Sequence, residues 1–248
     1  MQIELQNVSL TYPKTGPVLS DILIQIPTRD LTVLLGPSGS GKSTLLKIMA
    51  GLETTYTGSV HRSIKQNEIG FVFQEPHLMP WRTLIENVSL PLELQGELSK
   101  KEIADASREA LLKVGLANSE ILFPHELSGG MKMRASLARA LVAKPKLLLM
   151  DEPFAALDEQ TRFKLSEDLR HLWATSDLTI VFVTHSVHEA CFLGERILTL
   201  AGRPARIDQE IKLNLPRERA NGLRVESQYN QQLKRIYSLL DKSTDARP

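Results

Sequence analysis

The segment GPSGSGKST, which runs from Gly36 to Thr44, constrains the fold of this chain more than any other feature of the sequence. It follows the apolar run LTVLL, which predicts a buried strand, and it precedes TLLKIMAGL, which is typical of a helix. Glycines here let backbone N–H groups turn toward one centre, and the helix N-terminus adds a favourable potential for an anion. The sequence therefore predicts a phosphate-binding loop made of Gly36, Pro37, Ser38, Gly39, Ser40, Gly41, Lys42, Ser43 and Thr44.

Two side chains of this loop and two nearby acids have chemical roles of their own. Lys42 is expected to reach the β- and γ-phosphates of a nucleotide, and the Ser43 hydroxyl to bind Mg²⁺. The strand-like run LLLMDE ends in Asp151 and Glu152, and a buried strand emerges with charge only where something compensates it. Asp151 is predicted to hold the metal through its water, and Glu152 to act as the general base toward the attacking water. A plain helix start is the alternative interpretation of these acids.

Polar side chains also close two further runs that predict buried parallel strands. Gln74 closes IGFVFQ, and Thr184 with His185 closes LTIVFVTH, so both ends are expected at the edge of the sheet that faces the phosphates. Each signal is weak alone, because a histidine at a strand end is more often an ordinary polar edge residue. A metal cluster of His185, His188 and Glu189 is disfavoured, because no further clustered His or Cys completes it.

A second glycine-rich helix start occurs at Ser128, Gly129 and Gly130, in the segment ELSGGMKMR. An exposed helix N-terminus with serine and glycine can bind an anion, yet this one has no lysine and follows no buried strand. It can therefore complete a phosphate site but not build one. A chain that binds one nucleotide has no obvious use for it.

The rest of the sequence divides into three parts. Alternating apolar residues from Ile3 to Tyr12 and in DILIQI predict strands of a partly exposed antiparallel sheet. Residues 76–143 carry Ser/Thr-x-x-Glu capping boxes at Thr83 and Ser99 and predict a helical insertion. The polar tail has apolar residues at helical spacing, namely Val225, Tyr229, Leu233, Ile236 and Leu240. It is either a helix docked on its own domain or a helix that binds a partner.

The charge and apolar content of the chain exclude several classes of protein. Its 30 basic and 29 acidic residues leave a net charge of +1, which gives no electrostatic case for nucleic acid as a partner. No apolar run reaches the roughly eighteen residues that cross a bilayer, so membrane association is expected to go through a partner. The single cysteine, Cys191, lies among apolar residues and is expected to be buried rather than reactive.

Taken together, GPSGSGKST, the Gln74 strand end, LSGGM, LLLMDEP, AALD and the His185 strand end occur in the order found in ATP-binding cassette (ABC) ATPases. The chain resembles this family from Met1 to about Arg206, and LSGG between the two nucleotide motifs is highly specific for it. The resemblance implies an α/β P-loop NTPase fold with a mostly parallel core sheet, an N-terminal antiparallel β-subdomain and an inserted helical subdomain. The expected division of this single domain (1–248) is a core of 1–75 and 144–212, a helical subdomain of 76–143 and a helical tail of 213–248.

The resemblance also implies a use for the second glycine-rich start. Two cassettes of this family pair head to tail, and ATP lies between the phosphate loop of one and the LSGG helix of the other. Ser128 and Gly130, with Gly129 between them, would then bind ATP held by the partner subunit. Hydrolysis would require a homodimer in the ATP-bound state.

Further roles rest on the resemblance alone. Tyr12 matches the aromatic residue that stacks on adenine, and Gln74 matches the loop residue that senses Mg²⁺ and the membrane partner. His185 matches the γ-phosphate switch, and Asp158 in AALD matches the residue that crosses the dimer interface near the other phosphate loop. Glu152 is the general base by the same match.

Finer features are similar to importers of nitrate, taurine, alkanesulfonates and related solutes, including thiamine-precursor pyrimidines. The segments PWRT at 80–83 and RPARI at 203–207 are the closest matches. This similarity implies membrane permease subunits, a periplasmic or extracellular solute-binding protein, and a peripheral position on the cytoplasmic face of the inner membrane. Residues 74–87, with Leu78 and Trp81, are expected to contact the permease.

Two positions depart from the family pattern. Met131 occupies the fifth signature position, where glutamine is commoner, and this subfamily tolerates it. Met133 stands where a glutamine usually precedes the arginine, which puts a polar contact near the helix in doubt but not the glycine backbone.

Two other classes of protein stay open at this point. A cassette protein of DNA repair or translation usually has a coiled-coil insertion or tandem cassettes, which this chain lacks. A P-loop kinase for a small molecule would have no use for LSGG. The solute itself is not readable, because an ATPase subunit does not touch it.

Overall fold

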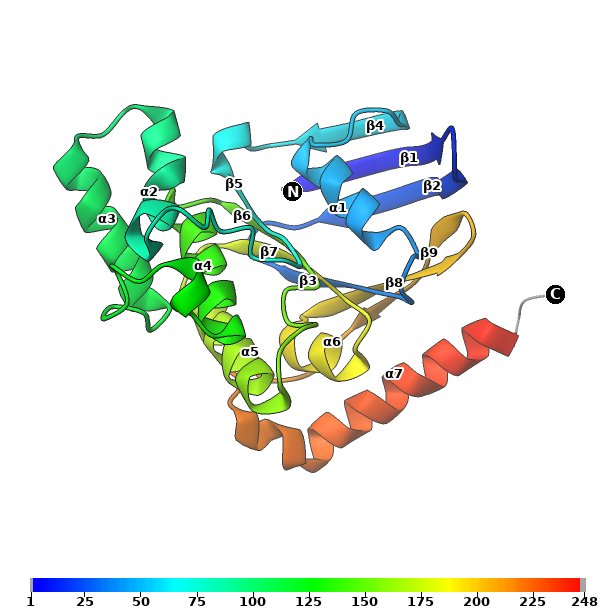
Figure 1. Ribbon diagram of the computed structural model, residues 1–248. Coiled ribbons are helices and arrows are strands. Elements are labelled where there is room, and N and C mark those ends of the chain that lie inside the picture. Colours follow the sequence, from blue (N-terminus) through cyan, green and yellow to red (C-terminus); the bar gives the residue numbers. More distant parts are fainter. Residues whose placement is uncertain (1, 246–248) are drawn as a thin grey trace.

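The computed structural model describes residues 2–245, and its strands form one sheet in the order β4-β1-β2-β9-β8-β3-β7-β6-β5 (Figure 1). The strands are β1 (Ile3–Tyr12), β2 (Gly16–Ile26), β3 (Leu31–Leu35), β4 (Thr57–Arg62), β5 (Ile69–Val72), β6 (Leu147–Asp151), β7 (Thr179–Thr184), β8 (Arg196–Gly202) and β9 (Ala205–Lys212). The helices are α1 (Lys42–Ala50), α2 (Leu84–Gln95), α3 (Lys100–Lys113), α4 (Gly129–Leu141), α5 (Glu159–Ala174), α6 (Val187–Leu193) and α7 (Ser227–Asp245). Short 3-10 segments are η1 (Gln66–Glu68), η2 (Pro124–Glu126) and η3 (Asn221–Val225).

The parallel half of the sheet consists of β8, β3, β7, β6 and β5. Every residue of β3, β6 and β7 is buried, which explains their continuous apolar sequences. Because these strands are parallel, their carboxyl ends meet at one edge. At that edge the phosphate loop follows β3, Asp151 ends β6 with Glu152 directly after it, and His185 follows β7.

The antiparallel half consists of β1 with its neighbours β2 and β4. Leu5 and Val8 are both buried although they are three residues apart, because the β1–β2 register shifts between them. Asn7 takes up the extra residue with a positive φ of 52°, as a β-bulge does. On β4 a Cβ at Gly58 would lie only 2.4 Å from the Asn7 carbonyl oxygen, so glycine is required there. The expected antiparallel strands are confirmed.

The helices cover the sheet in separate groups (Figure 1). Helix α1 lies between the antiparallel strands and the parallel ones, while α5 and α6 lie on the other face. Helices α2, α3 and α4 share a hydrophobic core of their own. The capping boxes predicted at Thr83 and Ser99 begin α2 and α3: Glu86 accepts from Thr83 N–H at 2.7 Å, and Glu102 accepts from Ser99 N–H at 2.8 Å. Within the described chain, no helix is both long and apolar enough to span a bilayer.

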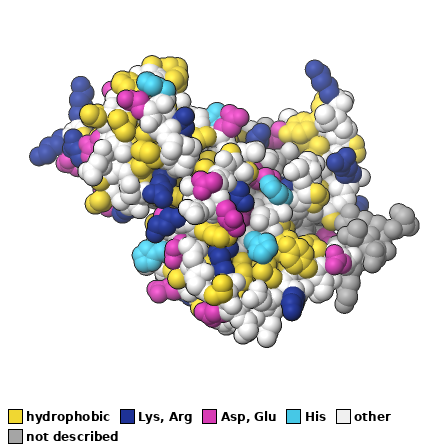
Figure 2. All heavy atoms as spheres, turned by 60° about the horizontal axis from the view of Figure 1, so that its bottom comes forward, with side chains coloured by type: hydrophobic (Ala, Val, Ile, Leu, Met, Phe, Trp, Pro, Cys, Tyr) yellow, Lys and Arg dark blue, Asp and Glu magenta, His cyan; other side chains and the backbone are white. Residues whose placement is uncertain are grey.

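The surface carries charges of both signs. On the face drawn in Figure 2, basic and acidic side chains of the described residues are interspersed. This distribution agrees with the net charge of +1.

The tail docks on its own domain through α7. Tyr229 and Ile236 are fully buried against the core, and the Tyr229 hydroxyl donates to the His188 carbonyl oxygen at 3.0 Å. The prediction of a docked helix is therefore confirmed for these residues. It was wrong for Val225, which is 85% exposed because it ends η3, before α7 begins.

Buried arginines attach the segment before α7 to the core. The Arg219 side chain donates to the carbonyl oxygens of Cys191, Phe192 and Gly194 at 3.1, 2.9 and 2.8 Å, at the end of α6. Its burial lowers the pKa of Arg219 to about 9, and Glu195 compensates the charge at 3.1 Å. Cys191 is buried as predicted, and desolvation raises the pKa of its thiol to about 12.

Candidate functional site

The phosphate loop connects β3 to α1 and turns through glycines. Gly39 and Gly41 have positive φ angles of 76° and 83°, which only glycine adopts readily. The Gly41 carbonyl oxygen accepts from Leu45 N–H at 2.9 Å and so begins the first turn of α1. A Cβ on Gly41 would lie 2.9 Å from Leu19 Cδ2, so β2 packs closely on the loop.

Lys42 lies at the centre of this loop, with only 3% of its side chain exposed. Its amine donates to the carbonyl oxygens of Gly36 and Pro37 at 2.9 and 2.8 Å. It also lies 3.4 Å from a carboxylate oxygen of Glu152. A buried cation held mainly by neutral carbonyl groups is suited to bind an incoming anion.

The side chains around Lys42 fit a phosphate and a Mg²⁺ ion. The Ser40 hydroxyl oxygen is buried and has no hydrogen-bond partner within residues 2–245, so the loop holds an unused polar group. The Ser43 hydroxyl donates to Asp151 Oδ1 at 2.8 Å, which places two hard oxygen ligands side by side. In the described chain no group of three His, Cys, Asp or Glu residues could hold a metal by itself. Two protein oxygens would suffice for Mg²⁺, which usually takes its remaining ligands from water and phosphates.

The charged form of the Asp151 side chain is energetically unfavourable when no metal ion is bound beside it. It is only 8% exposed, and burial raises its pKa, although the Ser43 hydroxyl bond and the nearby lysines oppose this shift. A raised pKa means that Asp151 favours the fold when protonated, and that this contribution is lost as the pH rises through the folded-state pKa. At neutral pH the buried charge therefore destabilises the nucleotide-free chain.

Asp151→Asn is expected to raise the melting temperature of the nucleotide-free protein at neutral pH by a few degrees, about 1 kcal/mol. The asparagine keeps an oxygen that accepts from Ser43 but carries no charge. The same variant should lose the additional stabilisation that Mg²⁺ with ATP gives to the wild type. Calorimetry of both proteins with and without Mg²⁺ and ATP measures both effects; a lower melting temperature for the nucleotide-free variant would contradict the prediction.

Glu152 and His185 meet directly after their strands end. His185 Nδ1 lies 2.8 Å from Glu152 Oε2, although the residues are 33 positions apart. Glu152 has a positive φ of 43°, and its N–H donates to the Val183 carbonyl oxygen at 3.1 Å. This unusual backbone conformation directs one carboxylate toward both Lys42 and His185. The arrangement can hold a base beside a bound phosphate.

Gln74 and Tyr12 lie less directly at the site than the other predicted residues. Strand β5 ends at Val72, so Gln74 follows it by two residues instead of closing it; its side chain is exposed and makes no hydrogen bond within residues 2–245. Tyr12 ends β1, and its hydroxyl donates to Glu53 at 2.9 Å. The sequence did not indicate this acid.

The second glycine-rich start has different neighbours from the phosphate loop. Ser128 caps α4, and its hydroxyl accepts from Met131 N–H at 3.3 Å. A Cβ on Gly130 would lie 2.7 Å from Thr161 Cγ2 in α5, and Asp158 caps that same helix by accepting from Thr161 N–H at 2.9 Å. The phosphate loop instead packs on β2, β6 and β8. Figure 1 shows α4 beside α2 and α3, away from α1.

Met133 is 4% exposed and belongs to the main hydrophobic core. The departure from glutamine at this position therefore replaces a polar side chain by an apolar one in an apolar environment.

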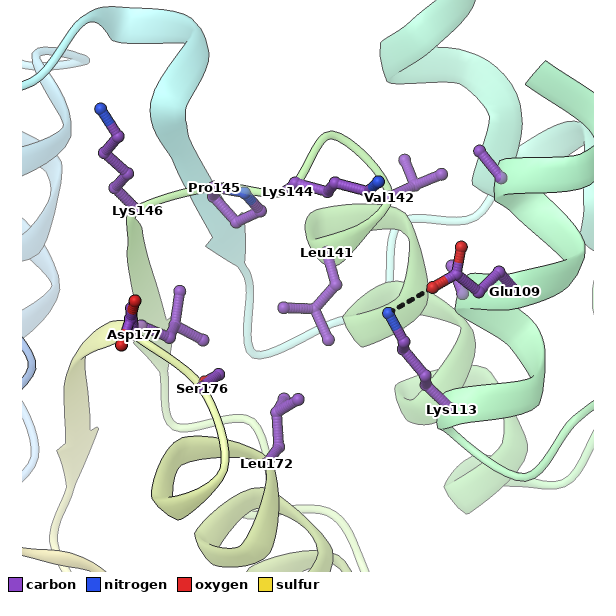
Figure 3. A pocket seen from close by; sticks show the side chains of 13 residues that line it. Glu109, Lys113, Leu141, Val142, Lys144, Pro145, Lys146, Leu172, Ser176 and Asp177 are labelled. Carbon is purple, nitrogen blue, oxygen red and sulfur yellow. Dashed lines mark ion pairs between the residues drawn. The ribbon is translucent and has the colours of Figure 1, made fainter. Parts of the chain in front are cut away.

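Figure 3 shows a cavity between α3, the end of α4 and the end of α5, whose rim carries Lys144 and the Lys113–Glu109 pair at 2.7 Å. None of the predicted site residues lines it.

Comparison with known proteins decides the family. A model of the family described as ABC transporter matches residues 19–155. The chain belongs to the ABC transporter family. It is 42% identical over 224 residues to the nitrate import ATP-binding protein NrtD of Synechocystis sp., covering 87% of this chain and 84% of that one. It is 40% identical over 228 residues to the aliphatic sulfonates import ATP-binding protein SsuB of Bacillus cereus, covering 89% of each.

A solved cassette gives the same result at the level of structure. The dimeric, post-hydrolysis state of the ATP-binding cassette MJ0796, bound to ADP and Pi, matches with a TM-score of 0.75 and 34% identity. The match covers 86% of this chain and all of that one. The resemblance, the α/β P-loop fold of the ABC type and the classification as an ATP-binding ATPase are thereby confirmed.

Sequence reasoning missed two charged residues beside the site. Glu189 was considered only as a metal ligand, and Arg162 was not considered, yet both line a small cleft with Glu152 and His185. One signal was available, because Ser186 and Glu189 have capping-box spacing and Glu189 N–H donates to the Ser186 hydroxyl at 3.3 Å. The Glu189 side chain itself turns to Thr184.

Proposed function

We propose that this ABC cassette is the ATPase subunit of an importer and that it works as a head-to-tail homodimer. The observation that carries the dimer is the position of the LSGG helix start. Its neighbours are in α5 and the preceding turn, not in the phosphate loop of its own chain. A partner subunit can therefore supply its Ser128, Gly129 and Gly130 to ATP held by this chain.

The residues of the site divide the chemistry among them. Residues 36–44 bind the phosphates through backbone N–H groups and the Lys42 amine, and Tyr12 stacks on adenine. Ser43, Asp151 and Gln74 would hold Mg²⁺, and the bound ion would neutralise charge at the phosphates. Glu152 accepts a proton from the attacking water, because its carboxylate is already directed beside Lys42. His185 holds Glu152 in place and responds to the γ-phosphate.

The dimer would transmit ATP binding to the membrane through residues 76–143, which we treat as one helical subdomain on the core of 1–75 and 144–212. ATP binds the closed dimer more tightly than the open one, and this difference drives the movement. Asp158 reaches the other phosphate loop, and the helix α7 of the tail stays docked on its own core through Tyr229 and Ile236. The chain is peripheral, on the cytoplasmic face of the membrane, and a solute-binding protein delivers the solute to the permease.

The class of solute rests on the relatives. Two of them are named as nitrate and aliphatic sulfonate import proteins, at about equal identity to this chain. We therefore propose nitrate or a sulfonate as the solute, with taurine and a pyrimidine as further candidates that rest on the sequence resemblance alone. A non-transport ABC ATPase is the alternative, and a P-loop kinase is not supported by the family.

Purification of the tagged protein from gently solubilised native membranes should recover a multi-helix permease. Trp81 is 73% exposed in the segment expected to contact that permease, so Trp81→Ala should reduce the recovery by roughly tenfold, because buried aromatic anchors dominate such interfaces. Leu94→Ala is the matched control, since Leu94 is 79% exposed on α2, outside that segment. Recovery of soluble partners alone, with normal ATPase activity, would favour the non-transport alternative.

A further inference from the structure

A buried acid organises the segment that carries His185. Glu189 on α6 has only 9% of its side chain exposed, and it accepts a hydrogen bond from the Thr184 hydroxyl. The same hydroxyl oxygen accepts from Ser186 N–H at 3.0 Å, and the Ser186 hydroxyl accepts from Glu189 N–H at 3.3 Å. The backbone on both sides of His185 is therefore fixed by contacts that lead to one carboxylate.

A guanidinium group connects this acid to the segment that follows Glu152. Arg162 Nε lies 3.6 Å from Glu189 Oε1, and Arg162 Nη2 donates to the Leu157 carbonyl oxygen at 2.8 Å. Consecutive turns run from Glu152 to Leu157, since Ala155 N–H donates to the Glu152 carbonyl oxygen at 3.2 Å and Leu157 N–H to that of Phe154 at 3.2 Å. Arg162 thus binds the carbonyl group of Leu157, which directly precedes Asp158.

The Arg162–Glu189 contact is incompletely formed. At 3.6 Å it is an ion pair rather than a hydrogen bond, and the buried Nε atom has no hydrogen-bond partner within residues 2–245. A buried N–H group without a hydrogen-bond partner costs free energy, so a small movement that brings Arg162 Nε within hydrogen-bond distance of the Glu189 carboxylate is favourable.

We infer that Arg162 and Glu189 are positioning residues, which hold the Glu152–His185 contact and connect it to the turn before Asp158. This inference rests on the proposed function, in which Glu152 is the base and Asp158 reaches the partner subunit. When the dimer closes and Asp158 moves, the turns between residues 152 and 157 transmit the movement to Glu152. The contacts of Arg162 and Glu189 transmit the same movement to His185. The base and its partner are aligned when the dimer closes.

The test is the ATPase activity of the full chain with Glu189→Gln and, separately, Arg162→Ala. Each variant should lower kcat roughly 10- to 100-fold, because a displaced catalytic group loses rate steeply with distance. The KM for ATP and the binding of ATP should stay within about twofold, because neither residue contacts the phosphate loop. The double variant should be no slower than the slower single variant, because the two residues act as one unit.

Glu195→Gln is the matched control for a merely structural effect. Glu195 also pairs with buried arginines, Arg170 and Arg219, but lies outside the site. It should lower the melting temperature with little change in kcat. If Glu189→Gln behaves in the same way as Glu195→Gln, the inference is wrong.

A second pair of variants keeps the test decisive if Glu189→Gln folds poorly. Thr184→Val removes the hydroxyl that donates to Glu189, and Thr184→Ser retains it. The valine variant should lose kcat at unchanged KM, and the serine variant should recover most of it; equal kcat values for both would overturn the inference. Wild type and Glu152→Gln are measured in the same assay. If Glu152→Gln hydrolyses ATP at the wild-type rate, the proposed function is wrong. If Glu152→Gln is inactive but Glu189→Gln hydrolyses ATP at the wild-type rate, only the inference about Glu189 is wrong.

Discussion

Glu152→Gln is expected to lower the kcat for ATP hydrolysis by about a thousandfold while ATP binding is retained. Glutamine has the shape of glutamate but cannot accept a proton from water at neutral pH. The contacts proposed to bind phosphate lie in the loop around Lys42, whose amine is held by two carbonyl oxygens as well as by Glu152. Removing the charge of Glu152 frees Lys42 to face the phosphate, so affinity for ATP should not fall.

The variant should also accumulate as a dimer when ATP and Mg²⁺ are present, because closure no longer ends in hydrolysis. Size-exclusion chromatography with light scattering measures the dimer, and phosphate release measures kcat. Glu159→Gln, a change in an exposed acid in the first turn of α5, is the control and should leave both unchanged. Normal hydrolysis by Glu152→Gln would show that another group is the base.

Ser128→Asp is expected to abolish ATP hydrolysis, and mixing it with Lys42→Ala is expected to restore activity. Aspartate caps a helix as well as serine does, so α4 keeps its N-terminal hydrogen bond to Met131 N–H. The added negative charge, however, repels the γ-phosphate of ATP held by the partner subunit. Ser128→Asn is the neutral control, with the same capping ability and most of the wild-type activity.

The mixture decides whether the site is shared between subunits. A dimer of one Ser128→Asp chain and one Lys42→Ala chain has one site with both defects and one site with neither. Random pairing should restore roughly one quarter of the wild-type activity, since half of the dimers carry one intact site. Activity that stays absent at every mixing ratio would contradict a head-to-tail arrangement with independent sites.

Local sequence was sufficient to predict the groups that gather at the edge of the sheet. A glycine-rich loop after a buried strand, and two acids at the end of another, are patterns typical of phosphate and metal binding. Because the strands are parallel, the predicted side chains meet without any knowledge of distant contacts, as Ser43 and Asp151 do at 2.8 Å. The capping boxes at Thr83 and Ser99 were predictable for the same reason, since all their atoms lie within one turn of chain.

Features that depend on contacts between helices were not predictable in this way. Arg162 and Glu189 lie on α5 and α6, and only the packing of these helices brings them together. The spacing of apolar residues could not show that Val225 lies outside the helix. Val225 ends the short 3-10 segment η3, so it does not share the helical periodicity of α7, which begins at Ser227. The exposure of Gln74 likewise depends on where β5 loses its pairing with β6, which ends at Val72 and Met150.

The attachment of Arg219 to the end of α6 has a consequence for how the molecule is completed during synthesis. Carbonyl groups of Cys191, Phe192 and Gly194, and the apolar surface that receives Tyr229, are made by the ribosome before the segment that covers them. Domains fold from the N-terminus as they are synthesised, and exposed apolar surface makes a nascent chain prone to aggregation. A nascent chain that ends before residue 219 therefore has its nucleotide motifs but an uncovered apolar surface, and we expect it to be prone to aggregation until α7 follows.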